Sequence, residues 1–202
     1  MVHLVAHEHV DSFRVLLDEK NEKPVGMFLV GASITPFRFY NLGAFNPRLR
    51  KVFYDRDTGT ILDYHQYYLD ISTDDTIKNG WKSDYEFLNA YNQTELTPTS
   101  LLKMVDEFDK EDNPHGNWIF YWDAELGHTE RQGDCAKVPG LQSNCRCEHI
   151  CGFKYLTFPE LNDCLKKCPS RIPASLIVII TLVSVAVIIG IALVIFITKR
   201  RR

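Results

Sequence analysis

Apolar positions in the first thirty residues follow the alternation that is typical of β-strands. Val2–Ala6 is a short apolar run, Ser12–Asp18 alternates between apolar and polar residues, and Val25–Val30 is again apolar. The charged stretch Glu19–Lys23 separates the last two runs. Two such runs with a polar turn between them predict a β-hairpin. The sequence therefore predicts three strands here, the second paired with the third.

A second hairpin is predicted further along the chain. Ser33–Pro47 is expected to be a loop, because prolines and a glycine interrupt it. Lys51–Tyr54 and Ile61–Leu69 are predicted strands, and the Asp and Gly residues between them suit a tight turn.

The spacing of apolar residues changes to that of helices after Thr73. Aromatic and apolar residues recur at helical spacing at Trp81, Tyr85, Leu88 and Tyr91. Thr97 and Pro98 are suitable cap and first-turn residues for a further helix. Pro159–Lys167 predicts a short helix, whereas the element type of the aromatic stretch Trp118–Trp122 stays open. Strands followed by helices predict an α+β fold.

The longest apolar run lies near the end of the chain. Ile172–Ile197 holds 26 residues without a charge, and four cations follow at Lys199–Arg202. A helix of that length rises roughly 39 Å, which exceeds a bilayer core of about 30 Å. The run therefore predicts a transmembrane helix at 172–197 with a basic cytosolic tail at 198–202. A buried core helix and a cleaved lipid-anchor signal are the alternatives; the length of the run and the terminal cations argue against them.

Composition places an acidic globular part before this span. The chain has 202 residues and a net charge of −3, and without the four terminal cations 19 basic residues stand against 26 acidic ones, a charge of −7. An acidic domain excludes the basic footprint of a protein that binds a nucleic-acid polymer. The sequence also lacks a Ser/His/Asp set, a phosphate-binding glycine loop and a dinucleotide-binding fingerprint.

The cysteines bear on the compartment of the globular part. All six fall within 34 residues before the predicted span, at Cys135, Cys145, Cys147, Cys151, Cys164 and Cys168. That density is typical of disulfide frameworks in oxidising compartments, and Asn92 begins an N-glycosylation sequon. The start of the chain has no signal-peptide pattern, so a literal interpretation is a tail-anchored protein facing the cytosol. The cysteines favour instead a lumenal or extracellular part whose true N-terminus lies upstream.

Two histidines near the start form a candidate metal site. His7 and His9 directly follow the first predicted strand, and side chains two residues apart project to one side of extended backbone. Both imidazoles could therefore reach one metal ion, although surface histidines are the simpler interpretation and a catalytic site needs at least three ligands. A zinc site at Cys145, Cys147, His149 and Cys151 is disfavoured, because lumenal cysteines oxidise.

Several segments resemble the C-terminal part of acid sphingomyelinase-like phosphodiesterases, a branch of the calcineurin-like metallophosphoesterases. The family's last metal motif, Gly-His-x-His-x-Asp-x-Phe, corresponds to the stretch Ala6–Phe13. Asn46-Pro47, followed by Arg50 and by the strand that ends at Tyr54, is the most characteristic match. The resemblance covers about Val2 to Cys164 and implies the C-terminal strands of a metallophosphoesterase α/β sandwich, followed by a helical region stapled by disulfides.

The resemblance also implies site residues. His7 and His9 would be ligands from the last motif of a two-metal, zinc-type site. Cys151 would pair with Cys164 and Cys135 with Cys145. Cys147 and Cys168 are additional to the family's set and would form a third pair, although six cysteines allow 15 connectivities.

The implied domain organisation has four parts. Residues 1–45 would be the remnant of a catalytic domain, 46–168 a sphingomyelinase-like C-terminal domain, 172–197 the span and 198–202 the tail. Ala6 replaces a glycine and is expected to crowd the turn, and Glu8 replaces a small residue or a histidine. The family's earlier metal motifs have no counterpart in the chain and are expected upstream of Met1.

Two functions follow from these observations. The first is a lumenal zinc-dependent phosphodiesterase of lipids or nucleotides, of which this chain is the C-terminal part and, with two ligands, inactive alone. The second is a non-catalytic, membrane-anchored ectodomain that binds a lipid or protein partner through its aromatic-rich helical part.

Overall fold

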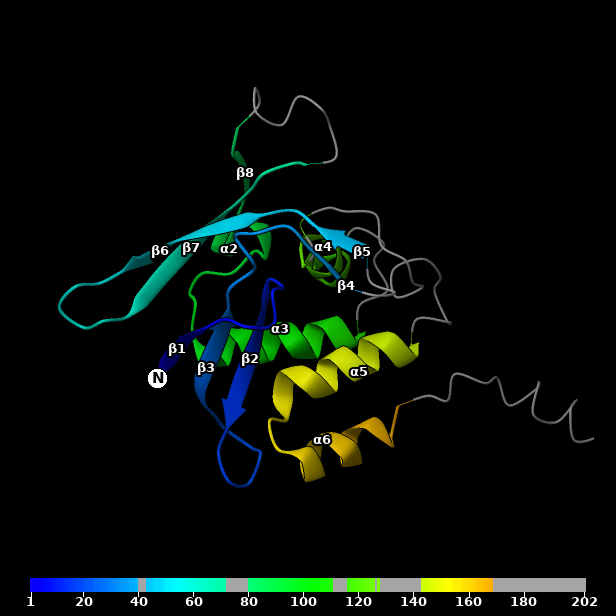
Figure 1. Cartoon of the computed structure of the whole chain (residues 1–202). Coiled ribbons are helices and arrows are strands. Elements are labelled where there is room, and N and C mark those ends of the chain that lie inside the picture. Colours follow the sequence, from blue (N-terminus) through cyan, green and yellow to red (C-terminus); the bar gives the residue numbers. More distant parts are fainter. Residues whose placement is uncertain (40–42, 72–79, 111–115, 126, 128–142, 169–202) are drawn as a thin grey trace, which may run out of the picture. The chain divides into compact units, whose positions relative to one another are not determined.

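The computed structural model describes residues 1–39, 43–71, 80–110, 116–125, 127 and 143–168 (Figure 1). Residues Met1–Cys168 form one compact unit. In chain order its elements are β1 (Val2–Val5), β2 (Ser12–Leu17), β3 (Pro24–Val30), β4 (Phe37–Phe39), β5 (Gly43–Phe45), β6 (Arg48–Tyr54), β7 (Ile61–Tyr68), β8 (Lys82–Glu86), α2 (Phe87–Ala90), α3 (Pro98–Lys110), α4 (Asn117–Ala124), α5 (Ser143–Lys154) and α6 (Phe158–Leu165). This mixture of sheets and helices confirms the predicted α+β class.

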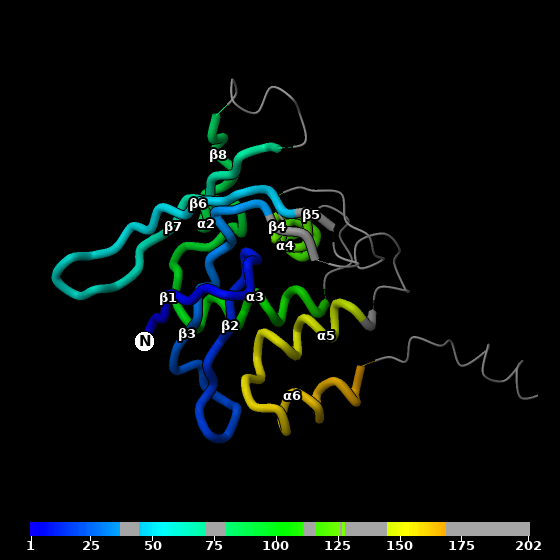
Figure 2. Tube along the Cα trace, viewed as in Figure 1, coloured from blue at the N-terminus to red at the C-terminus, as the bar shows by residue number. Residues whose placement is uncertain are grey.

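The first sheet has the strand order β1-β3-β2, with β1 parallel and β2 antiparallel to the central strand β3. The predicted hairpin of the second and third strands is therefore confirmed. Val5 of β1 and Ser12 of β2 both lie opposite Val30 in the register. The loop that joins β1 to β2 consequently crosses the carboxyl end of β3, and Figure 2 traces it between the two strands.

Two helices cover this sheet. α3 packs against β2 and β3, and α5 packs against β2. Val15, Met27 and Leu29 are buried within the resulting core. α3 begins where the sequence predicts, because Ser100 N–H donates to Thr97 Oγ1 over 3.1 Å and so satisfies one of the helix's first amide groups.

The second predicted hairpin is also present and gains a third strand. β6, β7 and β8 form an antiparallel sheet in that order. The predicted helix through Trp81, Tyr85, Leu88 and Tyr91 is wrong, since residues 82–86 form β8 and only 87–90 are helical. The physical reason is that β7 offers a free edge to this segment and the core buries Tyr85, so tertiary pairing overrides the helical spacing.

The remaining elements divide into confirmed and missed ones. α6 confirms the short helix predicted over 159–167, and α4 settles the open element at 118–122 as a helix. β4 and β5 interrupt the predicted loop, and α5 was not predicted. Besides its buried apolar residues Ile150 and Phe153, α5 carries three cysteines, several charged residues and a glycine, so its sequence lacks an amphipathic stripe.

Several predictions concern residues outside the described ranges. They are the span at 172–197, the basic tail at 198–202 and the cysteine at position 135. Within the described ranges, the helices are all too short or too polar to cross a bilayer. The predicted division of the globular part at residue 45 also stays a prediction.

Candidate functional site

The two histidines of the candidate metal motif lie on the loop between β1 and β2. The side chain of His7 is exposed and that of His9 is half-buried. β1 ends at Val5, and the backbone φ is 95° at His7 and 62° at His9. The expectation of two imidazoles projecting from one side of extended backbone is therefore wrong, because both residues adopt the left-handed region that side chains disfavour.

This loop stores backbone strain. A non-glycine residue at positive φ costs about 1–3 kcal/mol and persists only where the surrounding structure enforces it. Such residues cluster at binding and catalytic sites. Asn21 and Asn92 have similar φ values in exposed turns, so the feature that sets this loop apart is the presence of two such histidines within three residues. Ala6, in contrast, has an exposed side chain and no positive φ, so the crowding expected from its methyl group does not arise.

Three backbone hydrogen bonds hold the loop. Gly31 N–H donates to Val5 O over 2.8 Å, and Ser33 N–H donates to His9 O over 3.3 Å. At the far end, Asp11 N–H donates to Glu125 O over 3.1 Å. The segment that follows β3 and the end of α4 therefore both contact the loop, and residues distant in sequence fix its course.

Asp11 ends the loop and is the most constrained residue in it. Its side chain is only 4% exposed. Oδ2 accepts a hydrogen bond from the Tyr85 hydroxyl over 2.6 Å and lies 3.2 Å from Arg48 Nη1, while Oδ1 accepts from Arg50 Nη2. Two cations and a phenol thus compensate for burying this carboxylate, which would otherwise be strongly unfavourable.

The two arginines extend the network through the second sheet. Arg48 pairs with the buried Asp84 and donates to Ala124 O, and Arg50 Nε donates to Gln66 Oε1 over 3.0 Å. Burial alone would lower the pKa of Arg48, but the carboxylates of Asp11 and Asp84 outweigh it and raise that pKa. Two carboxylates therefore balance two guanidinium groups inside the protein.

Buried tyrosines complete this network. The Arg50 guanidinium lies 4.0 Å from the centre of the Tyr64 ring, and the hydroxyls of Tyr64 and Tyr85 are 3.3 Å apart. Burial raises the pKa of Tyr85 well above its ordinary value, and the negative charge of Asp11 raises it further. Tyr85 is therefore a neutral hydrogen-bond donor to Asp11 at physiological pH.

Sequence reasoning found Asp11 as part of a motif but missed its role, and it did not predict the role of Arg48. The predicted strand begins only at Lys51, whereas β6 begins at Arg48, so Arg48 and Arg50 occupy alternate positions of this strand and share one face of it. This pattern does not show whether that face is buried or solvated. The residues that bury it and bind the two arginines come from three separate segments of the chain.

The histidines supply suitable donors for a zinc-type ion but too few of them. Imidazole nitrogen is a preferred zinc ligand, and a catalytic zinc site needs three protein ligands. Within the described residues the one group of three metal-ligating residue types is Cys147, Cys151 and Cys168, with ligand atoms within 4.8 Å of one another. His7 and His9 thus fit as a partial ligand set.

The three cysteines are not a metal site, because disulfides consume their thiols. Cys147 is bonded to Cys168 and Cys151 to Cys164, the two pairings expected for these residues. Cys145 is disulfide-bonded as well. The predicted partner of Cys145 lies outside the described residues, so that pairing stays a prediction. The low expectation of zinc at Cys145–Cys151 agrees with this bonding.

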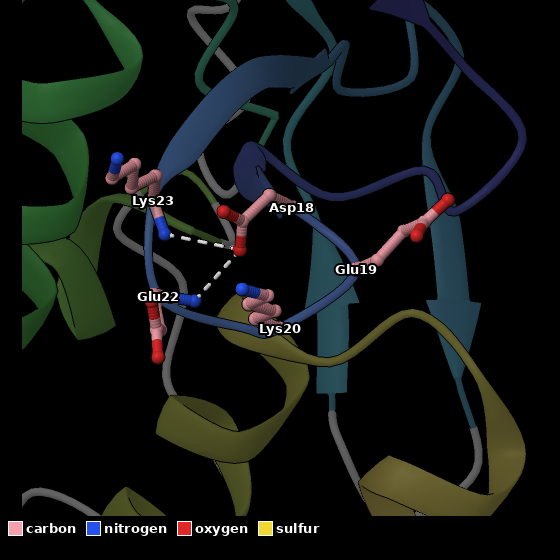
Figure 3. Close-up of a pocket in the computed structure, with 5 residues that line it drawn as sticks. All are labelled: Asp18, Glu19, Lys20, Glu22 and Lys23. Atoms are coloured by element: carbon pink, nitrogen blue, oxygen red, sulfur yellow. Dashed lines mark hydrogen bonds between the residues drawn. The ribbon is translucent and has the colours of Figure 1, made fainter.

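A hollow at the turn between β2 and β3 offers no comparable chemistry. Figure 3 shows its charged side chains spread over the turn, with Glu22 and Lys23 N–H both donating to the carboxylate of Asp18. These bonds lower the pKa of Asp18, which is therefore an ionised turn-forming residue. Asn92, the predicted glycosylation site, lies in an exposed turn after α2 at a φ of 50°.

Fold and site together define a mixed α+β domain with a strained histidine loop and a disulfide-stapled helical end. The family model described as "Acid sphingomyelin phosphodiesterase C-terminal region" matches residues 23–170. The chain belongs to this family. The resemblance to this family is thereby confirmed; the matched range includes Asn46-Pro47 but begins after the histidine motif, whose role as a metal motif stays a prediction.

Curated relatives agree with the family. The chain is 30% identical over 164 residues to the cyclic GMP-AMP phosphodiesterase SMPDL3A of Bos taurus, covering 80% of this chain and 34% of the relative. It is 23% identical over 181 residues to the acid sphingomyelinase-like phosphodiesterase 3b of Mus musculus, covering 87% and 37%. It is 32% identical over 110 residues to the sphingomyelinase phosphodiesterase C of Dictyostelium discoideum, covering 50% and 24%. The chain thus spans about a third of the length of the first two relatives.

Proposed function

We propose that this chain is the C-terminal part of a metal-dependent phosphodiesterase, in which His7 and His9 ligate one zinc-type ion of a two-metal site. The observation that carries the proposal is the loop itself, which holds two imidazoles on a left-handed backbone between β1 and a buried anchor at Asp11. Family membership supports it, since the matched relatives are phosphodiesterases by name.

The proposed chemistry divides between the metal and the chain. Bound zinc ions in such sites polarise a phosphoryl oxygen and lower the pKa of bound water. In this chain, His7 and His9 would supply imidazole nitrogens, and the hydrogen bonds at Val5, His9 and Asp11 would fix where those imidazoles lie. The substrate class is a phosphodiester of a lipid or a nucleotide, by analogy with the names of the relatives.

Two ligands do not make a binuclear site, so we expect the chain alone to be inactive. The test is zinc titration of the purified 202-residue chain by calorimetry, together with hydrolysis of a chromogenic phosphodiester. We expect weak binding of at most one zinc and no turnover. The double variant His7→Ala/His9→Ala should lose that binding, whereas His65→Ala, a control at a half-buried histidine on β7, should keep it. Tight binding of two zinc ions would contradict the proposal.

The alternative function is a non-catalytic, membrane-anchored ectodomain that binds a lipid or protein. The departure from the family motif at Glu8, in place of a small residue or a histidine, favours it. Transcript sequence upstream of Met1 separates the two functions. In-frame Asp-x-His and Asn-His motifs behind a signal peptide support the enzyme, and a stop codon within the same exon supports the alternative.

We further propose that the globular part is lumenal or extracellular, with a single span at 172–197 and a glycan at Asn92. The disulfides support an oxidising compartment. In intact microsomes, the globular part should be protected from added protease. At the surface of intact cells, it should be accessible to protease. Glycosidase should increase gel mobility of the wild type but not of Asn92→Gln. Modification of free thiols at all six cysteines would contradict this topology.

A further inference from the structure

We propose that Asp11 is a positioning residue for the metal-binding loop, which it locks onto β6 through Arg48 and Arg50. This inference rests on the proposed function, because it assigns a role in placing His7 and His9 as ligands. It makes β6 of the second sheet a structural support for the loop that crosses the end of the first sheet.

The loop needs such an anchor because its backbone is strained. Both histidines have positive φ values, and the surrounding structure must hold such residues. On one side of them, β1 pairs with β3 up to Val5. On the other side, Ser33 N–H holds His9 O, and the buried Asp11 follows two residues later.

The contacts of Asp11 fix the position of its carboxylate group. Oδ1 accepts from Arg50, Oδ2 accepts from Tyr85, and Arg48 lies within ion-pair distance of Oδ2. These donors belong to β6 and β8, and the backbone partner Glu125 follows α4. Four groups from three distant segments therefore converge on one residue of the loop.

The short link between anchor and ligand makes this arrangement matter for metal binding. One residue, Val10, separates His9 from Asp11. Consecutive Cα atoms lie about 3.8 Å apart, whereas metal–ligand distances tolerate only about 0.2 Å. A displacement of Asp11 therefore displaces His9 by more than a ligand position can absorb.

Charge balance gives the anchor a second effect. Arg48 and Arg50 face the carboxylates of Asp11 and Asp84, so these four charges balance one another next to a site for a dication. Replacing Asp11 by asparagine leaves a net positive charge beside the loop. The same substitution at Asp84 removes equal charge from the same network, but Asp84 lies on β8 and not on the loop.

The experiment compares Asp11→Asn with Asp84→Asn in the 202-residue chain. One readout is Zn²⁺ affinity by calorimetry, and the other is amide hydrogen exchange of residues 6–10. We expect Asp11→Asn to weaken Zn²⁺ binding about 10–100-fold, the range for residues that support metal ligands, and to accelerate exchange in the loop. Asp84→Asn should change Zn²⁺ affinity by less than about threefold. Equal effects of the two variants on both readouts would show a general stabilising role and overturn the inference.

Two further variants keep the outcome decisive. If Asp11→Asn fails to fold, Arg50→Lys and Arg50→Gln replace it, and lysine should restore part of the affinity that glutamine loses because it keeps the charge. If His7→Ala/His9→Ala binds Zn²⁺ as the wild type does, the proposed function fails. The positioning role is then judged by loop exchange, and unchanged exchange in Asp11→Asn overturns it.

Discussion

The histidine loop and α6 are held in place by opposite means. Between the ends of β1 and β2, buried ion pairs and hydrogen bonds on Asp11 fix the loop. α6 buries none of its residues, and disulfides from Cys164 and from Cys168, just beyond its end, fasten it to α5. A covalent bond keeps two segments near each other. A converging set of charges instead fixes the position of one residue, as a ligand loop requires.

The largest effect is expected where the charged network is broken. Arg48→Met leaves the carboxylates of Asp11 and Asp84 without one of their cations in a buried setting. Removing one partner of a buried ion pair costs about 3–5 kcal/mol of the free energy of unfolding. Urea denaturation followed by circular dichroism measures the loss.

A matched control comes from the surface of α3. Lys103 Nζ lies 3.9 Å from Glu107 Oε1, and both side chains are exposed. Lys103→Met should change the free energy of unfolding by less than about 1 kcal/mol, since exposed ion pairs contribute little. If Arg48→Met were as mild as this control, the network would not be an anchor.

The next largest effect is expected from breaking one of the disulfides that join α5 and α6. Cys151→Ser/Cys164→Ser opens a bond between residues 13 positions apart, which corresponds to about 3 kcal/mol from the unfolded chain's gain in entropy. Hydrogen exchange should accelerate in α6 and much less in α5, because Phe153 of α5 stacks on Phe13 with ring centres 4.7 Å apart. Equal acceleration in both helices would mean that the disulfides also hold α5.

The histidine loop and the disulfide-linked helices α5 and α6 also differ in how much of their structure could be predicted from the sequence. Cysteines are visible in a sequence, and the pairing of Cys151 with Cys164 was expected from the resemblance, with Cys147 and Cys168 as a further pair. The clear alternation of β2 was equally accessible, whereas the prediction for β6 began at Lys51 and left out Arg48 and Arg50. The left-handed backbone at His7 and His9 was not, because the loop is held by hydrogen bonds of His9 with Ser33 and of Asp11 with Glu125, which lie further along the chain. Tyr85 was assigned to a helix for the same reason, since its partner Asp11 lies 74 positions away.

Alkaline pH should weaken the charged network and leave the disulfide pairing between α5 and α6 intact. Burial raises the pKa of Tyr64, Tyr85 and Tyr121 above the ordinary value of 10.0. Their stabilising contribution is therefore complete below pH 10 and falls as the pH rises toward the folded-state pKa, by about 1.4 kcal/mol per pH unit for each tyrosine. The difference in tyrosinate absorbance between the wild type and Tyr85→Phe isolates one buried tyrosine and should increase together with unfolding. An increase in this difference below pH 10, before any loss of structure, would contradict the burial of Tyr85.

The smallest effect tests a polar contact between the β2–β3 turn and α6. Asn21 Nδ2 donates to Glu160 Oε1 over 2.9 Å, and this bond is the largest cause of the lowered pKa of Glu160, with a bond from Thr157 second. Asn21→Gly removes the side chain and keeps the positive φ of 58° accessible, so the Glu160 pKa should rise part of the way toward 4.5 without a measurable change in stability. Asn21→Asp, which places a like charge there, should raise it further. Carboxyl chemical shifts followed over an NMR pH titration measure both changes in the Glu160 pKa.

Hydrogen exchange of α6 tests whether the contact between Asn21 and Glu160 also holds the helix. Because the disulfides already hold α6, its hydrogen exchange in Asn21→Gly should stay as in the wild type. Faster exchange in this variant would mean that the polar contact also fixes the helix.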